Sequence, residues 1–430
     1  MRNWLIVLIC LLCPWQLYFP AGAIGSLSFV QLSLVPLVAF LLLHMAMRPR
    51  EPVFPDHVPF ALLVAFACLC LVAALWSPDQ AMAVKTFLKF TAVAVVCVIV
   101  AGSSDRVRKS AITALGISAV ILAMLVVVFR VFPLLETAFL FSPVAVYTVD
   151  PDLLISLLDG VERANVLADD RAGAVFTNAN VASLFLGLVL FLVLAVRFRP
   201  GRTMALGLPL VAGVVATGSK AGLIALLVTG LLWTIATMKG RLSLGTVSVI
   251  LASGLVALPL LGFYVVRFQL WEVAAEALGS RIEVWQVAIT QLGQNPLLGL
   301  GFGGWERYID EARPFEGTFV AYPVHNLVLI AWSWVGIVGA IVATAFVLTA
   351  IGTPLQKRSD GDLDPAVATA LSLGFVWLFL QSMFTNAALT DIRIGIPVAV
   401  ALGMLTLAPQ EKTRLHTPQP KTSTQGYRSD

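Results

Sequence analysis

Charged residues are scarce in this chain. Only 12% of its 430 residues are Asp, Glu, Lys or Arg, whereas 59% are hydrophobic and the mean hydropathy is +0.92. This composition excludes an ordinary soluble domain, and the net charge of +4 gives no sign of a nucleic-acid partner. We therefore predict an all-α, polytopic integral membrane protein in which residues 1–408 form a single transmembrane domain.

Cysteine and histidine are also few, and neither forms a metal-binding pattern. All five cysteines lie inside apolar runs, so no disulfide framework is predicted. The four histidines are scattered without the spacing of a zinc site, and we expect neither a metal nor another cofactor. One metal alternative stays open, because Asp150-x-Asp152 in TVDPDLLI has a carboxylate spacing that can bind a cation, although Pro151 fits a turn equally well.

Long apolar runs, in contrast, fill most of the sequence. A helix needs about 20 predominantly apolar residues to cross the hydrocarbon core of a bilayer, and about twelve runs in the chain meet this description. They cover residues 3–19, 25–47, 58–76, 81–102, 110–132, 180–198, 204–217, 221–237, 244–266, 326–351, 366–386 and 392–408. About twelve transmembrane helices are therefore predicted.

Lysine and arginine collect in every second connection between these runs, which indicates the side of the membrane. The positive-inside rule places these connections and both termini in the cytoplasm. Two long connections, about 133–179 and 267–324, then lie outside, and residues 409–430 form a disordered cytoplasmic tail. The first run could also be read as a cleaved signal peptide, but an uncleaved first span is favoured.

Several cations lie at the outer ends of the predicted spans, where topology does not explain them. They are Lys85, Lys89, Arg171, Lys220, Arg281 and Arg393. Lys85 and Lys89 are one helical turn apart, so their ammonium groups could project together. Cations at helix ends suit an anionic ligand such as phosphate. The alternative for each lysine is that its long side chain simply extends to the membrane interface.

His325 and Asn326 stand just before the long apolar run in YPVHNLVLIAWSWVG. His325 is the one histidine predicted on the outer side, and its unperturbed pKa near 6.5 suits a general base. An interfacial imidazole can also merely bind water or a carbonyl group. Its position among several cations favours a functional role.

Two segments resemble the hallmark region of the O-antigen ligase and O-antigen polymerase family. SRIEVWQVAITQLGQNPLLGLGFGGW followed by HNLVLIAWSWVGIVG matches that region over residues 280–340, and ten residues separate His325 from Gly336, as in the ligases. RAGAVFTNANVASLFLG matches a second family segment, which contains Arg171. TGSKAGLIALL matches a third, with Lys220 where arginine is usual. The Gly299-x-Gly301-x-x-Gly304 pattern also fits a dinucleotide fingerprint, but without a βα unit it predicts a tight turn in the outer loop.

The resemblance implies a metal-independent, inverting glycosyltransferase in a bacterial inner membrane. Its donor is a glycan on undecaprenyl diphosphate, and its acceptor is the lipid A core in a ligase or another glycan in a polymerase. We expect His325 to act as the base and Arg281 to stabilise the diphosphate. Supporting roles are expected for Lys220, Arg171, Lys85, Lys89, Asn326 and Arg393. A transporter of lipid-linked sugars remains the alternative, although no internal repeat supports it.

Overall fold

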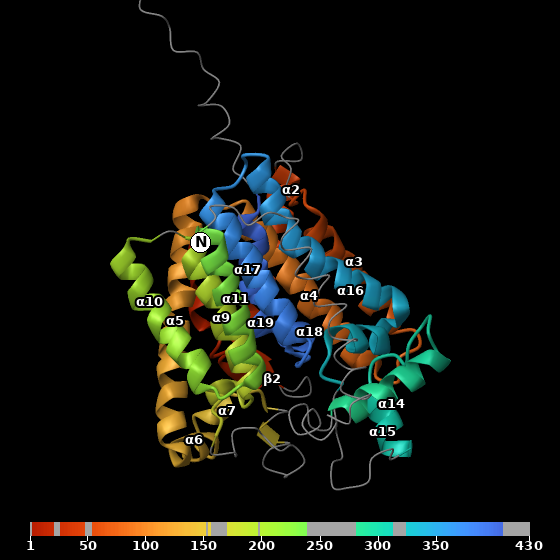
Figure 1. Ribbon diagram of the computed structural model, residues 1–430. Helices are drawn as coiled ribbons and strands as arrows, with labels where there is room; N and C mark the ends of the chain where they lie inside the picture. Colours follow the sequence, from red (N-terminus) through yellow and green to blue (C-terminus); the bar gives the residue numbers. More distant parts are fainter. Residues whose placement is uncertain are drawn as a thin grey trace, which may run out of the picture.

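The chain folds into a bundle of helices packed side by side (Figure 1). A computed structural model describes residues 2–20, 26–47, 54–151, 154–155, 170–196, 198–238, 281–312 and 324–406. A small antiparallel sheet joins β1 (Tyr18–Pro20) to β2 (Ser26–Ser28), with Phe19 opposite Leu27. Apart from this hairpin, every regular element of the described chain is a helix, which confirms the predicted all-α class.

Eleven of the twelve predicted apolar runs coincide with helices of the bundle. These are α1 (Arg2–Leu12), α2 (Phe29–Met47), α3 (Val58–Ala73), α4 (Gln80–Ala101), α5 (Asp105–Val131), α9 (Ala179–Ala195), α10 (Pro200–Ala216), α11 (Lys220–Met238), α16 (Leu327–Ser359), α17 (Pro365–Ser382) and α19 (Ile392–Met404). The run 244–266 and the tail 409–430 lie outside the described residues. The count of twelve spans therefore stays a prediction.

The first run differs from the prediction of one helix over residues 3–19. Helix α1 ends at Leu12, and Gln16 and Leu17 then adopt left-handed backbone angles, with φ of 57° and 48°. Pro14 lacks the N–H that a continuing helix needs. The run then ends in strand β1, which pairs with β2 at the start of the second predicted run.

Among the described residues, four helices are long and apolar enough to cross a membrane, namely α4, α5, α16 and α17. Several shorter apolar helices accompany them, including α3, α9, α10 and α19. A bilayer favours helices because each satisfies its backbone hydrogen bonds internally. The chain is thus a multi-pass membrane protein.

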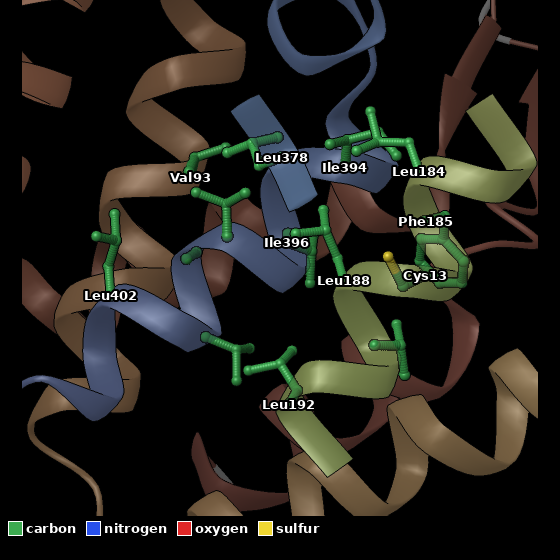
Figure 2. Close-up of a cluster of buried hydrophobic side chains, with 14 of the residues drawn as sticks. Cys13, Val93, Leu184, Phe185, Leu188, Leu192, Leu378, Ile394, Ile396 and Leu402 are labelled. Carbon is green, nitrogen blue, oxygen red and sulfur yellow. The ribbon is translucent and has the colours of Figure 1, made fainter. Parts of the chain in front are cut away.

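Helix α9 forms the centre of the bundle and is buried along nearly its whole length. Figure 2 shows its Leu184 beside Ile394 of α19 and its Leu188 beside Ile396, all four of them buried. At Gly187 a side chain would overlap the Trp377 ring, whose Nε1 donates to Leu184 O at 3.1 Å. This close packing makes α9 a rigid support for the loop before it.

Short helices gather at one end of the bundle. They are α6 (Pro133–Leu140), α7 (Ala145–Thr148), α14 (Arg281–Gln294) and α15 (Gly304–Ala312), and Figure 1 shows all four at its lower end. They belong to the two long connections predicted outside the membrane. We call the end of the bundle that carries them the site end.

Candidate functional site

His325 lies directly before α16, in a backbone conformation that is unusual for its residue type. Its φ is +47°, in the left-handed region that residues other than glycine seldom adopt. The next residue, Asn326, caps the helix, because its Oδ1 accepts hydrogen bonds from the N–H groups of Val328 and Leu329 at 3.0 and 3.2 Å. The cap fixes where α16 begins and therefore where the imidazole stands.

The His325 imidazole is held in its neutral form by its surroundings. Burial, together with the nearby charge of Arg281, lowers the pKa of His325 from its ordinary value to about 4. Its Nδ1 is buried and has no hydrogen-bond partner in the described part of the chain. A neutral imidazole with an unengaged nitrogen can accept a proton from a ligand.

Arg281 is the first residue of α14, and its guanidinium is partly removed from water. It lies over the Phe384 ring at 5.9 Å, and its Nε is buried without a hydrogen-bond partner among the described residues. Burial and the nearby charge of Arg171 lower the pKa of Arg281. Two guanidinium groups and a histidine thus lie within electrostatic reach of one another, an arrangement that an anion would stabilise.

Trp285 fixes the helix of Arg281 against the segment of His325. Its Nε1 donates to Val324 O at 2.8 Å, one residue before the histidine, and its ring lies 6.4 Å from the Phe384 ring. Both contacts of Trp285 are packing contacts with protein groups. Because Arg281 stands one helical turn before Trp285, the tryptophan limits the separation of guanidinium and imidazole.

The glycine-rich segment between α14 and α15 docks into a kink of α16. Leu300 N and Gly301 N both donate to Ser333 O, at 2.8 and 3.0 Å, and Ile337 N donates to Pro296 O at 2.9 Å. Gly299, Gly301 and Gly303 have φ between +67° and +76°. The kink is at Gly336, with φ 78° and ψ −173°. The predicted tight turn is therefore present, and no βα unit accompanies it in the described residues.

Arg171 and Lys220 are carried by two loops that are joined to each other. Ala172 N donates to Thr217 O at 3.1 Å, which holds the loop of Arg171 against the turn before α11. Lys220 begins α11 and is exposed. Ser219 holds this helix start, since its Oγ donates to Asn180 Oδ1 at 2.7 Å and accepts from Gly222 N at 3.0 Å.

Lys89 and Arg393 form a second group, bound to protein atoms rather than to His325. Lys89 Nζ donates to Thr390 O at 2.9 Å. Arg393 is 3% exposed, pairs with Asp391 at 2.7 Å and donates to Val175 O at 3.0 Å. Lys85 is exposed, one turn before Lys89. Arg393 thus ties α19 to the short helix η3 (Ala174–Phe176), which follows the Arg171 loop.

An apolar cleft extends into the bundle from the start of α16. It lies between α3, α4, α16, α17 and α19 and is partly open to the outside. Leu327, the residue after Asn326, lines it together with Leu63, Phe346 and Leu378. Lys89 and Asp391 are its charged lining residues. A long apolar chain attached to a group at His325 could enter this cleft.

The possible metal pair is only partly described. Asp150 Oδ2 accepts a hydrogen bond from Tyr18 Oη at 3.3 Å, and Asp152 lies outside the described residues.

Sequence reasoning did not identify Glu136, a buried carboxylate that holds the Arg171 loop. The one signal for it was a carboxylate in the otherwise apolar stretch RVFPLLETAFLF.

Part of the chain matches a known protein family. A family model described as O-antigen ligase matches residues 205–344. The matched segment contains Lys220, Arg281, His325 and Gly336. No curated protein matches the chain.

Proposed function

We propose that the chain, which is assigned to the O-antigen ligase and O-antigen polymerase family through residues 205–344, transfers a glycan from undecaprenyl diphosphate to the lipid A core at the periplasmic face of a bacterial inner membrane. One observation carries this proposal. Trp285 and the kinked α16 hold a neutral imidazole beside a partly buried guanidinium. Such a pair combines a proton acceptor with an anion site.

The site end faces the periplasm in this proposal, and both termini lie in the cytoplasm. Lys357 and Arg358 occupy the last turn of α16, whose first turn follows His325. The 33 residues of that helix span roughly 50 Å, enough to cross a bilayer. Positive residues mark the cytoplasmic end of a span, so His325 is assigned to the opposite side.

The proposed reaction is a direct displacement. The acceptor hydroxyl oxygen attacks the anomeric carbon of the glycan, the bond from that carbon to the phosphate oxygen breaks, and its electron pair leaves with the diphosphate. His325 accepts the proton of the hydroxyl group. Attack opposite the leaving group inverts the anomeric centre. Arg281, supported by Arg171 and Lys220, offsets the growing negative charge in place of a metal ion.

Donor binding would also adjust the strength of the base. Arg281 is one cause of the low pKa of His325 in the free protein. A bound diphosphate brings negative charge next to both groups, and negative charge favours the protonated imidazole. The pKa of His325 is therefore expected to rise when the donor binds. The base would then become strong only when a donor is present.

The apolar cleft supports a carrier with a long prenyl chain. It starts beside Asn326, so a chain lying in it would leave its diphosphate near His325. Lys89 stands at the charged part of the cleft, with Lys85 one turn away, and both are assigned to electrostatic support of the donor. Asn326 and Arg393 are assigned to holding the site, through the α16 cap and the contact with Val175.

The pH dependence of kcat/KM is expected to follow the free-protein pKa of His325. Lowering the pH through about 4 protonates the imidazole and removes the base, so the acid limb should lie near that value. An unperturbed histidine would place it near pH 6.5 instead. Values of kcat/KM measured in proteoliposomes between about pH 3 and pH 8 define the limb on both sides of its expected midpoint. A midpoint at 6.5 would contradict the buried, cation-adjacent imidazole.

Lys220 offers a test of the diphosphate site. Lys220→Ala should raise KM for the donor about tenfold, because one charge-assisted contact is lost. Lys220→Arg restores the residue usual in the family and should keep KM at or below the wild-type value, since guanidinium binds phosphate oxygens in pairs. Donor titrations of the three proteins provide the comparison. An unchanged KM in Lys220→Ala would remove this residue from the site.

Ligase and polymerase differ in their acceptor, and the spacing of His325 and Gly336 favours the ligase. A lipopolysaccharide gel and a carrier-lipid analysis of a deletion strain test the choice. Long glycans retained on undecaprenyl diphosphate, with bare lipid A core, indicate a ligase. Single repeat units on the carrier indicate the alternative, an O-antigen or exopolysaccharide polymerase. No change in either pool would contradict both and favour a lipid-linked sugar transporter.

A further inference from the structure

Glu136 is a buried carboxylate outside the reaction described above. It lies on α6 and is 1% exposed. Its Oε1 accepts two hydrogen bonds, from Gly173 N at 2.9 Å and from Ala174 N at 2.6 Å. Its Oε2 is buried and has no hydrogen-bond partner within the described chain. Burying a carboxylate costs free energy, so a buried glutamate at this position must have a compensating structural role.

The backbone that Glu136 binds has an unusual shape. Ala174 and Thr177 have φ of +49° and +53°, in the region that seldom accommodates residues with a side chain. At Gly173 a Cβ atom would stand 2.7 Å from Asn178 N, so the turn is tight. Two successive N–H groups thereby point at one oxygen, which is the arrangement that binds an anionic oxygen. The carboxylate stabilises a conformation that costs free energy by itself.

This turn begins two residues after Arg171. Between Arg171 and this turn, Ala172 N donates to Thr217 O at 3.1 Å. The segment of Arg171 is therefore attached at two points, one on the Lys220 turn and one on Glu136. The other end of the turn is tied to Arg393 through Val175 O. The place of the Arg171 guanidinium relative to Arg281 depends on these attachments.

We propose that Glu136 is a positioning residue that acts through Arg171, holding its loop so that the guanidinium meets the donor diphosphate. The inference rests on the proposed function. Glu136 holds the loop by accepting hydrogen bonds from backbone N–H groups. Its effect on the position of Arg171 therefore depends on where its accepting oxygen lies. Burial raises the pKa of Glu136, while its two N–H bonds lower it. Glutamine keeps the accepting oxygen at the same distance and should therefore replace it.

The test uses full-length protein in proteoliposomes with a donor of undecaprenyl diphosphate carrying one glycan. Glu136→Leu should raise KM for the donor, and Ki for inorganic pyrophosphate, by about tenfold with kcat within about twofold. Glu136→Gln should keep both constants near wild type. Glu311→Leu removes a carboxylate that is 64% exposed and serves as the matched control. A loss confined to kcat, or equal effects of Gln and Leu, would overturn the proposal.

Coupling to Arg171 provides the second readout. Arg171→Ala alone and the Glu136→Leu/Arg171→Ala double variant should have the same KM, because Glu136 acts through that side chain. A KM in the double variant equal to the product of the two single effects would contradict a role that acts through Arg171. If Glu136→Leu fails to insert, Glu136→Asp keeps the charge but shortens the reach, and it should raise KM in folded protein. An unchanged KM in Glu136→Asp would refute the proposal.

His325→Ala in the same assay separates this inference from the proposed function. Absence of transfer in His325→Ala, together with an unaltered donor KM in the Glu136 variants, overturns the role of Glu136 alone. Full transfer by His325→Ala overturns the proposed chemistry, and with it the role of Glu136.

Discussion

Replacing His325 with alanine is expected to lower glycan transfer by about 10²- to 10⁴-fold, the range supplied by a general base. The imidazole is neutral, its Nδ1 is unengaged by the described residues, and Arg281 lies near enough to influence its pKa. Alanine removes the proton acceptor and leaves the Asn326 cap of α16 in place. The readout is lipopolysaccharide from a deletion strain complemented with each variant at equal membrane levels.

His57 supplies a matched control. It is buried, caps α3 by accepting from Phe60 N at 3.2 Å, and has its Nε2 3.1 Å from Leu402 O. His57→Asn keeps a capping side chain and should keep transfer near wild type. Normal lipopolysaccharide from correctly inserted His325→Ala protein would exclude His325 as the base.

Replacing Gly336 with alanine is expected to have the largest effect on folding. Gly336 has φ 78° and ψ −173°, a combination reserved for glycine, and a Cβ there would overlap the Leu297 carbonyl group. Strain and overpacking together should cost about 3 to 5 kcal/mol. The change would also push the glycine-rich segment away from α16. Arg281 and His325 would then move apart, because that segment follows the helix of Arg281.

Gly361 separates backbone strain from steric overlap. Its φ is +75°, like that of Gly336, but a Cβ at Gly361 would meet nothing within 4 Å. Gly361→Ala should therefore cost only about 1 kcal/mol. Thermal unfolding of the purified proteins, followed by fluorescence, measures both. Equal stability losses for the two variants would show that docking of the glycine-rich segment contributes little.

Much of the architecture could be predicted because the bilayer imposes simple rules. Runs of apolar residues and the placement of cations follow from the thickness of the hydrocarbon core and the positive-inside rule, and helices occupy eleven of the predicted runs. The start of the chain was the exception. There a hydropathy pattern does not reveal that Pro14 ends the helix and that a hairpin follows.

The arrangement of the site was only partly predictable. Position on the outer side placed Arg281 and His325 in one layer, but only tertiary packing through Trp285 brings them together. Asn326 was expected to support the reaction, and its side chain caps α16. Arg393 was expected among the ligand cations, and its partner Asp391 is two residues away in the sequence.

Glu136 is the residue whose role was hardest to predict from the sequence. Its partners are backbone N–H groups of residues almost forty positions away, which carry no signal in side-chain chemistry. The turn that directs these N–H groups at Glu136 has left-handed backbone angles at Ala174 and Thr177. Such angles are not predicted for alanine or threonine, because they favour glycine. A lone carboxylate in an apolar stretch was the available indication.

The most direct test of the account is a balance of products from purified protein in proteoliposomes. The donor is a labelled glycan on undecaprenyl diphosphate, and the acceptor is lipid A core. The proposed mechanism predicts one undecaprenyl diphosphate released for each glycan joined to lipid A, with inverted anomeric configuration and about 10²- to 10⁴-fold less product from His325→Ala. Movement of intact donor across the bilayer without bond cleavage would contradict it.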